Sequence, residues 1–202
     1  MKPRSDIADQ TIEYYDRNSE KFFSETVIVD MSEIYTLFLE LIFEGGKILD
    51  AGCGSGRDSL YFAQKGFNVT AFDASEEMVR KASELTGLNI IQKRFDEIDW
   101  TEKFDGIWAC ASLLHLPKNQ LGNIFETLIK SLKTGGAIYA SFKEGTGEAK
   151  ENGRFFSYYS EAELKNVLKN CGANEVVNCW TSNDVRRNNQ QQRWINLLIK
   201  RS

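Results

Sequence analysis

Residues 50–56 (DAGCGSG) place a glycine at every second position, shortly after an acidic side chain. Gly52, Gly54 and Gly56 would let the backbone turn sharply and approach a bound molecule closely. Dinucleotide enzymes use the spacing Gly-x-Gly-x-x-Gly, whereas here Arg57 stands where the third glycine of that pattern belongs. The segment predicts a ligand-binding loop that departs from the dinucleotide type, with a purely structural turn as the alternative.

A second acidic residue, Asp73, follows Asp50 by 23 positions and ends the next apolar segment. A carboxylate at the tip of the second strand of a doubly wound sheet commonly accepts hydrogen bonds from both hydroxyl groups of a ribose. Capping of the following helix by Asp73 or Ser75 is the alternative, and the two roles are compatible. The two acidic positions with the glycines between them predict a site for a ribose-containing ligand.

Scarce residue types argue against several kinds of catalysis. The chain has one histidine, His115, and four cysteines without Cys-x-x-Cys spacing, so we expect no metal site. No Gly-x-Ser-x-Gly sequence accompanies the histidine, which argues against a serine hydrolase. His115 has an ordinary pKa near neutrality, so it could act as a general base or contact a substrate. Packing in the loop before Pro117 is the alternative.

Strand and helix patterns alternate along the chain and predict the elements that position these residues. Such alternation predicts an α/β fold, with a Rossmann-like, mostly parallel sheet and helices on both faces. A polar segment without helical pattern separates the last two strands, so we expect them to form an antiparallel hairpin. Gly135 and Gly136 are expected to end the third helix. Strands are expected at residues 47–51, 68–72, 89–92, 105–111, 137–142, 175–180 and 194–200, and helices at 57–66, 75–85, 121–132 and 160–172.

Length and composition are those of an ordinary globular protein of 202 residues. The net charge of −4 argues against a nucleic-acid coat and against an anionic membrane surface as partners. The longest uncharged stretch is too short to span a bilayer, and the N-terminus lacks the apolar part of a secretory signal. We therefore expect a reduced, cytoplasmic protein. The sequence indicates no oligomeric state.

Four segments together resemble a known family. They resemble, in order and spacing, the successive motifs of class I S-adenosylmethionine-dependent methyltransferases. Residues 54–66 and 109–115 are most similar to the small tellurite-resistance-type enzymes and their unassigned relatives. The resemblance covers residues 14–200 and implies a seven-stranded sheet whose last strand is inserted antiparallel. The four segments are 47–56 (KILDAGCGSG), 72–78 (FDASEEM), 104–116 (FDGIWACASLLHL) and 133–142 (KTGGAIYASF).

This resemblance implies roles for individual residues. The three glycines would wrap the methionine part of S-adenosylmethionine, and Asp50 would orient its ammonium group directly or through water. Asp73 would hold the ribose, with Ala74 and Met78 against the sugar and adenine. The cofactor-binding residues that the resemblance implies are Asp50, Gly52, Cys53, Gly54, Gly56, Arg57, Asp73, Ala74, Met78, Phe95, Asp96, Cys110 and Ala111.

Two of these assignments have alternatives. Either Phe95 or Asp96 would contact the adenine, because residues 94–97 (RFDE) depart from the Gly-Asp-Ala that such enzymes usually carry after the third strand. Arg57 would form a salt bridge with the cofactor carboxylate, or it would face solvent at the start of a helix. Residues 110–112 end the fourth expected strand, where these enzymes direct the methyl group at its acceptor.

We expect one methyltransferase domain at residues 1–202, with N-terminal lid helices at 1–45, a cofactor-binding core at 46–142 and substrate-side inserts within 143–202. Core packing is the alternative role for the aromatic residues of the lid. Arginines beside aromatic side chains suit an anionic, planar or phosphate-bearing acceptor, with a solvated basic loop as the alternative. The residues expected to contact the acceptor are Tyr15, Arg154, Asp184, Arg186 and Trp194.

Methyl transfer from a sulfonium mainly needs proximity, alignment and exclusion of water, and it needs a base only when the nucleophile is protonated. We therefore expect a methyltransferase acting on a small molecule. RNA or protein as the acceptor is less favoured because no separate recognition domain is visible. A non-catalytic cofactor-binding regulator stays open because binding and turnover need much the same residues, and a dinucleotide oxidoreductase is the remaining alternative.

Overall fold

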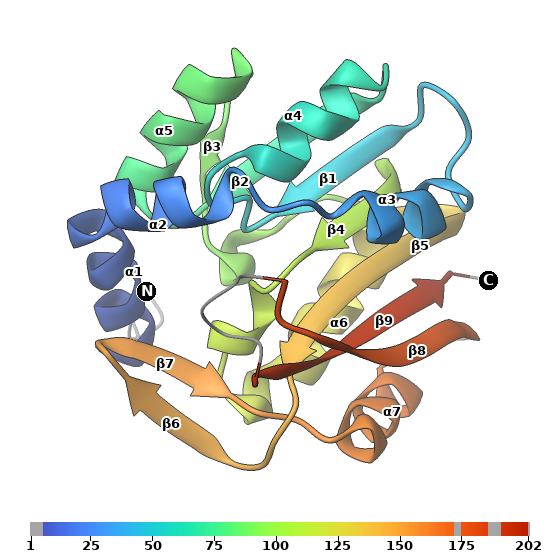
Figure 1. Ribbon diagram of the computed structural model, residues 1–202. Coiled ribbons are helices and arrows are strands. Elements are labelled where there is room, and N and C mark those ends of the chain that lie inside the picture. Colours follow the sequence, from blue (N-terminus) through green and yellow to red (C-terminus); the bar gives the residue numbers. More distant parts are fainter. Residues whose placement is uncertain (1–5, 172–174, 186–190, 202) are drawn as a thin grey trace.

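Seven strands form one twisted sheet through the centre of the molecule, with helices on both of its faces (Figure 1). The computed structural model describes residues 6–171, 175–185 and 191–201, and the statements below refer to these. The strand order across the sheet is β3-β2-β1-β4-β5-β9-β8. Its strands are β1 (Lys47–Ala51), β2 (Asn68–Asp73), β3 (Ile91–Gln92), β4 (Phe104–Ala109), β5 (Leu132–Lys143), β8 (Glu175–Asn183) and β9 (Arg193–Lys200).

The sheet is parallel from β3 to β5 and antiparallel where β9 meets β5 and β8. The last strand of the chain, β9, therefore lies between β5 and β8 instead of extending the edge of the sheet. The expected α/β fold, a Rossmann-like seven-stranded sheet with an antiparallel terminal hairpin, is confirmed.

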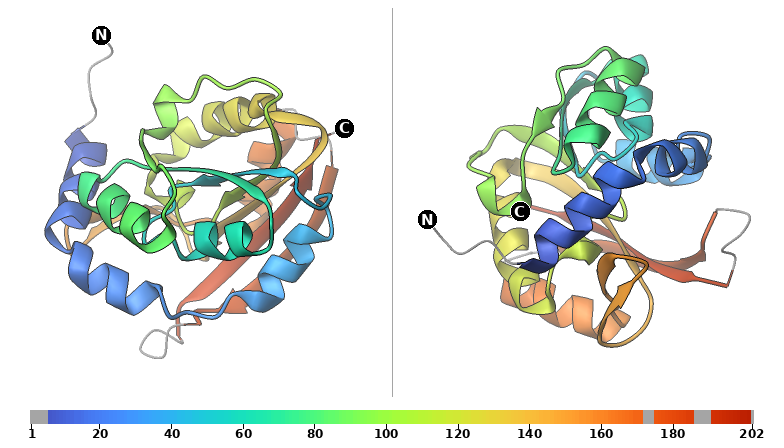
Figure 2. Two further views of the ribbon diagram at one scale, coloured as in Figure 1. Left: turned by 90° about the horizontal axis from the view of Figure 1, so that it is seen from above. Right: turned by 90° about the vertical axis from the view of Figure 1, so that its left-hand side faces the viewer.

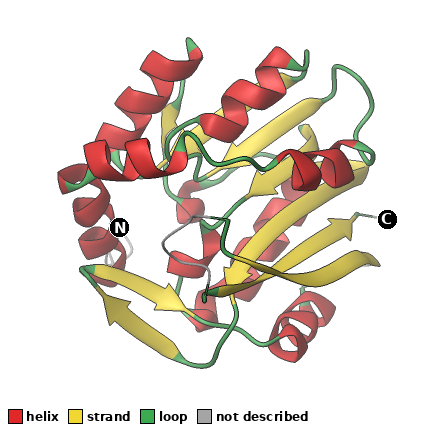
Figure 3. Ribbon diagram, viewed as in Figure 1, coloured by secondary structure: helices red, strands yellow, loops and turns green. Residues whose placement is uncertain are grey.

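Helices cover both faces because successive strand residues point to opposite sides of the sheet. Ile48 and Trp108 pack in one cluster with residues of α3 and α4, whereas Leu49 and Ile107 pack in another with residues of α6 and α7. Figure 3 separates helices from strands by colour. The helices are α1 (Asp6–Arg17), α2 (Ser19–Thr26), α3 (Ser32–Leu39), α4 (Arg57–Gln64), α5 (Glu76–Thr86), α6 (Lys118–Ser131) and α7 (Glu161–Asn170), with the 3₁₀ turns η1 (Phe95–Glu97) and η2 (Leu113–His115).

Local capping fixes where two of these helices begin. The hydroxyl of Ser75 accepts a hydrogen bond from the N–H of Met78 at 3.2 Å, which starts α5. Ser160 and Glu163 form the expected capping box at the start of α7. Across the described ranges of the chain, no helix combines the length and the apolar character that crossing a membrane requires.

The expectation that Gly135 and Gly136 end the preceding helix is wrong. Helix α6 ends at Ser131, and both glycines belong to β5. The N–H of Gly135 donates to the carbonyl of Arg201 at 2.8 Å, and a Cβ on Gly136 would lie 2.9 Å from the carbonyl oxygen of Asp105. Gly136 therefore allows the close approach of neighbouring strands, whereas Gly135 adopts a positive φ of 80° with open space around it.

A second, two-stranded sheet lies among the expected substrate-side inserts of residues 143–202, where no strand was expected before residue 175. Strands β6 (Glu148–Glu151) and β7 (Arg154–Ser157) form an antiparallel hairpin. Asn152 and Gly153 both have positive φ, at 50° and 84°, which is typical of a tight two-residue hairpin turn. The hairpin lies beside α1, with the N–H of Phe155 donating to Thr11 Oγ1 at 3.0 Å (Figure 2).

Candidate active site

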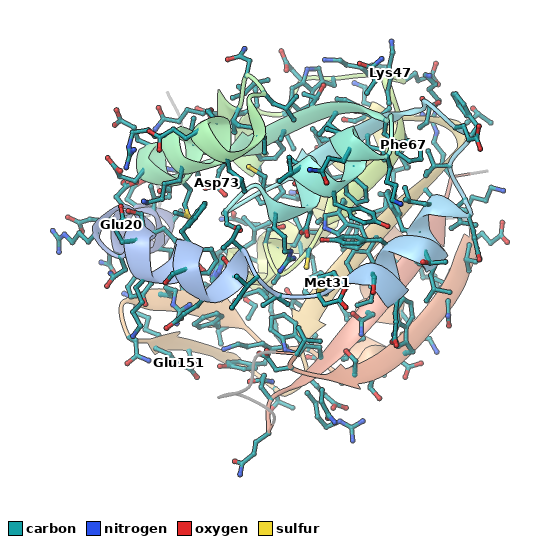
Figure 4. The ribbon with its side chains drawn as sticks, turned by 45° about the horizontal axis from the view of Figure 1, so that its top comes forward. Glu20, Met31, Lys47, Phe67, Asp73 and Glu151 are labelled. Atoms are coloured by element: carbon teal, nitrogen blue, oxygen red, sulfur yellow. The ribbon has the colours of Figure 1, made fainter. Side chains whose placement is uncertain are left out.

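A cavity of about 790 Å³ lies at the carboxyl ends of the parallel strands, within the usual size range of small-molecule sites. Helices α1 and α2, strands β5 and β7 and the end of β8 complete its walls. Asp73, Met31 and Glu151 mark three of its sides in Figure 4. The residues expected from the sequence that line it are Tyr15, Gly52, Cys53, Gly54, Arg57, Asp73, Ala74, Met78, Phe95, Asp96, Cys110, Ala111, His115, Arg154, Asp184 and Trp194.

Two of the expected site residues are placed differently. Gly56 does not line the cavity: a Cβ there would lie 2.9 Å from the Cβ of Ala82, so this glycine brings α4 and α5 together. Asp50 is 1% exposed and lies behind the glycine loop, where it accepts a hydrogen bond from Ser59 at 2.6 Å. Direct contact of Asp50 with a ligand in the cavity is therefore disfavoured. Arg186 lies outside the described residues.

The glycine loop is tightly confined. Gly52 and Gly54 both have positive φ, at 77° and 52°. A Cβ on Gly52 would lie 2.6 Å from the Cβ of Ser112, and one on Gly54 would lie 3.2 Å from the ring of Phe22 on α2. Side chains at these positions would displace the end of β4 or the wall that α2 forms, so the loop requires glycine at the cavity surface.

The carboxylate of Asp73 joins the ends of β1 and β2. Its Oδ2 accepts from the N–H of Gly54 at 2.8 Å, and its Oδ1 accepts from the N–H of Ser75 at 3.0 Å. Burial raises the pKa of Asp73, while these backbone hydrogen bonds act in the opposite direction. Ser75 is the N-cap of α5. Asp73 lines the cavity, where its carboxylate can accept hydrogen bonds from a ligand.

Arg57 faces the cavity and not bulk solvent, so the solvent-facing alternative is wrong. Its side chain is 17% exposed, and it donates to Asp58 through Nε at 2.6 Å and Nη2 at 2.9 Å. The buried Asp58 also accepts from the Tyr35 hydroxyl and from Trp108 Nε1. Burial would raise the pKa of Asp58, but the Arg57 charge and these donors lower it. Asp58 therefore holds a guanidinium at the cavity wall.

His115 is held between two partners. Its Nδ1 lies 2.7 Å from the carbonyl oxygen of Phe155, which can only accept, so Nδ1 carries the proton. Its Nε2 lies 2.8 Å from the hydroxyl of Tyr15 on α1 and therefore accepts from it. Burial, aided by the positive charges of Arg154 and Lys143, lowers the pKa of His115 to about 4. His115 is therefore a neutral imidazole whose unprotonated Nε2 faces Tyr15.

Arg154 lies among aromatic rings at the hairpin side of the cavity. Its guanidinium carbon lies 4.7 Å from the ring centre of Tyr14 and 5.0 Å from that of Phe156. Burial raises the pKa of Tyr15, and the charge of Arg154 opposes that rise. Lys143 Nζ lies 3.7 Å from the ring centre of Phe156. These contacts place positive charge at one end of the cavity.

The wall formed by β5, β9 and the end of β8 carries polar groups, most of which sequence reasoning missed. Asp184, expected from the sequence, is 5% exposed and accepts from Trp194 Nε1 at 3.2 Å. Asn196 on β9 accepts from the Tyr139 hydroxyl at 2.8 Å and donates to Ser182 at 2.9 Å. No local motif marks these last residues, because their partners come from different strands.

Both candidates for the adenine contact reach the cavity. The ring of Phe95 packs edge-on against Phe72 at 5.3 Å between centres. Asp96 is 63% exposed and lies 3.5 Å from Arg94. An apolar ring at the wall and a carboxylate at the rim are therefore both available to a ligand.

Comparison with known proteins identifies similar chains. Residues 48–136 match the model of a family described as a methyltransferase domain. YqeM of Bacillus subtilis, named as a methyltransferase, is 34% identical over 111 residues, which are 50% of this chain and 45% of YqeM. TehB of Haemophilus influenzae, named as an S-adenosyl-L-methionine-dependent methyltransferase, is 26% identical over 172 residues, 82% of this chain and 59% of TehB. The chain spans about half the length of these curated relatives.

A solved structure extends the likeness to nearly the whole chain. The 1,6-didemethyltoxoflavin-N1-methyltransferase of Burkholderia thailandensis, crystallised with 1,6-didemethyltoxoflavin and S-adenosylhomocysteine, matches with a TM-score of 0.77. The match covers 96% of this chain and 87% of that enzyme at 20% identity. At this identity the match concerns the fold.

Proposed function

We propose that this chain is a class I S-adenosylmethionine-dependent methyltransferase that transfers a methyl group to a small organic acceptor. The match of residues 48–136 to the methyltransferase-domain model, the likeness to TehB and the fold shared with the Burkholderia enzyme support this proposal. One observation carries the proposal: the glycine loop, Asp73 and Arg57 line the same cavity as the Tyr15–His115 pair. The proposed cofactor site and a proton acceptor thus share one cavity.

The cavity wall fits the groups of the cofactor. Asp73 already accepts two backbone N–H groups, and a carboxylate has about four acceptor positions, so it can also accept from a ribose diol. Arg57 would bind the terminal carboxylate of the amino-acid part. Met78 and Phe95 offer apolar surface to the adenine.

When bound, S-adenosylmethionine supplies an activated methyl group on a positively charged sulfur. The chain's part is to align the acceptor with it and to exclude water. Tyr15 and Phe22 contribute to this by covering the cavity from α1 and α2. His115 accepts the hydroxyl proton of Tyr15 in a hydrogen bond, so the pair can take up the proton of an acceptor nucleophile bound beside Tyr15.

We also propose a domain organisation, a cellular location and an acceptor size for this enzyme. Residues 1–202 would act as one domain, since the cavity draws on the lid part at 1–45, the core at 46–142 and the inserts within 143–202. Cys53, Cys110 and Cys179 form no disulfide with a described residue, which supports a reducing, cytoplasmic location. A small acceptor is supported by the cavity size and by the heterocycle named in the Burkholderia structure.

Calorimetry tests the cofactor half of this proposal. We predict that S-adenosylhomocysteine binds and that NADH does not. Asp73→Ala should weaken S-adenosylhomocysteine binding by about 10- to 150-fold, the usual effect of losing a charged hydrogen-bond partner. Ser160→Ala is the matched control, because it removes the α7 cap outside the cavity lining and should lower stability while leaving affinity nearly unchanged. NADH binding in place of S-adenosylhomocysteine would end the methyltransferase proposal.

Transfer itself is tested with cofactor labelled at the methyl group. Label incubated with a cell lysate should appear in the small-molecule fraction after separation from RNA and protein. Label in RNA or protein would contradict the small-molecule acceptor. Binding of S-adenosylhomocysteine without label in any fraction would favour the regulator.

A further inference from the structure

Arg154 lacks the carboxylate partner that the other described arginines have. Six of the seven arginines in the described ranges form an ion pair with Asp or Glu, and Arg154 forms none with a described residue. Its guanidinium instead packs against the rings of Tyr14 and Phe156. A cation at a cavity wall is therefore left with one uncompensated charge.

The Nε–H of Arg154 is also unpaired. This atom is buried and has no hydrogen-bond partner among the described residues. Folded proteins rarely bury a charged donor without an acceptor unless a ligand completes it. Since Arg154 lines the cavity, an oxygen atom of a molecule bound there can supply the missing acceptor.

The charged residues near Arg154 limit the net charge of a ligand that can bind there. Lys143 lies close to Arg154 through Phe156, but it is 3.6 Å from the carboxylate of Glu151. Asp184, on another wall of the cavity, is a further acid and is bound to the indole of Trp194. The single uncompensated cation matches one negative charge, and these acids would repel a doubly charged phosphate.

Part of the remaining acceptor space is apolar. Phe22, Val29, Met31, Ile34 and Trp194 line the same cavity. An inorganic oxyanion would leave these side chains without contacts, whereas a ring or a short hydrocarbon chain would cover them. The occupant therefore needs an apolar body as well as a charge.

We propose that the methyl acceptor is an organic monoanion with an apolar or aromatic body whose carboxylate is bound by Arg154 Nε–H. Its nucleophilic atom then lies toward the Tyr15–His115 pair and the end of β4. This inference rests on the proposed function, because it assigns one end of the same cavity to the acceptor.

The test compares matched probes on protein saturated with S-adenosylhomocysteine. Calorimetry would measure 4-hydroxybenzoate, anthranilate and indole-3-acetate, each against its neutral amide. We expect carboxylates to bind at least about tenfold more tightly than their amides. The preference should vanish in Arg154→Gln, fall partly in Arg154→Lys, and persist in Arg193→Gln, which alters an exposed arginine outside the cavity lining.

Three results would overturn the inference. They are absence of binding by every carboxylate, equal binding of acids and amides, or a preference that survives in Arg154→Gln. Tighter binding of phenyl phosphate or of selenite than of any carboxylate would replace the monoanion with another oxyanion. Retained S-adenosylhomocysteine binding shows that the variants are folded, so these failures concern the acceptor alone. Loss of that binding in the unmodified protein would instead count against the proposed function.

Discussion

His115 carries its proton on a fixed nitrogen, and that determines what it can do near neutral pH. The carbonyl of Phe155 retains the proton on Nδ1, and the Tyr15 hydroxyl occupies Nε2. Because the pKa of His115 falls to about 4, the imidazole is neutral over the whole ordinary pH range. A ring in this state can accept a proton during turnover but carries no standing charge that would repel a sulfonium.

The pH dependence of stability reports this state. An unfolded histidine has a pKa near 6.5, so protons favour the unfolded chain as the pH falls from about 6.5 toward 4. Relative to His115→Asn, which keeps a donor for the Phe155 carbonyl, the wild type should lose up to about 3 kcal/mol of stability between pH 7 and pH 4. Urea unfolding at several pH values measures this difference. Parallel stability curves for the two proteins would contradict a buried neutral ring.

Asp58 shows why some site residues escape sequence reasoning. Asp73 and the glycine loop are recognisable because their neighbours along the chain form a motif. Asp58 accepts hydrogen bonds from Tyr35 and Trp108, which are 23 and 50 residues away in the sequence. The sequence around Asp58 does not indicate these contacts. Its one local signal is that it follows Arg57 in the first turn of α4.

Three elements meet at the Asp58 carboxylate, namely α3 through Tyr35, β4 through Trp108 and α4 through Arg57. This buried contact fixes the position of α3 and of the Arg57 guanidinium together. Since it couples a helix of the N-terminal part to the cofactor side of the cavity, stability and cofactor affinity should depend on the same side chain.

Asp58→Asn should therefore lower both quantities. Removing one partner of a buried ion pair leaves the other charge uncompensated, which typically destabilises a protein by about 3–5 kcal/mol. S-adenosylhomocysteine affinity should fall because Arg57 loses its fixed orientation. Tyr35→Phe, which removes only one donor, is the milder control and should cost about 1 kcal/mol with affinity nearly kept. Urea unfolding and calorimetry on both variants measure this, and unchanged affinity in Asp58→Asn would contradict a positioning role.

Strands and helices of the sheet could be predicted because apolar runs and capping residues are local signals. The β6–β7 hairpin was missed, although Asn152-Gly153 is a strong turn signal, because glycines and charges around it resemble a loop. Gly135 and Gly136 led to a wrong helix end, because a glycine pair after a helical pattern is typical of a C-cap. Only the packing of β5 beside β4 and Arg201 reveals their actual role.

At the scale of the whole molecule, the two sides of the cavity differ in the contacts that stabilise them. One side is the sheet edge, where hydrogen bonds to backbone N–H groups join the glycine loop to Asp73 and β2. The other side is α1 and α2, which reach the core through partly exposed ion pairs such as Arg94–Asp9 and Lys81–Glu20. The carboxylates of these pairs are 44% and 85% exposed, so the pairs contribute little to stability. Although α1 also bonds His115 and Phe155, we expect α1 and α2 to separate from the core more readily than the sheet edge opens.

The double variant Asp9→Asn with Glu20→Gln tests this division. It should speed hydrogen exchange in α1 and α2 and S-adenosylhomocysteine release by about two- to fivefold each, because the ion pairs that hold these helices are removed. Exchange in β1 and β4 should stay unchanged. Glu84→Gln, which removes an exposed ion pair of 2.6 Å within α5, is the matched control and should alter neither rate. Exchange mass spectrometry and stopped-flow release measure both effects. If release stays constant while the helices exchange faster, ligands leave by another route and α1 and α2 do not control access.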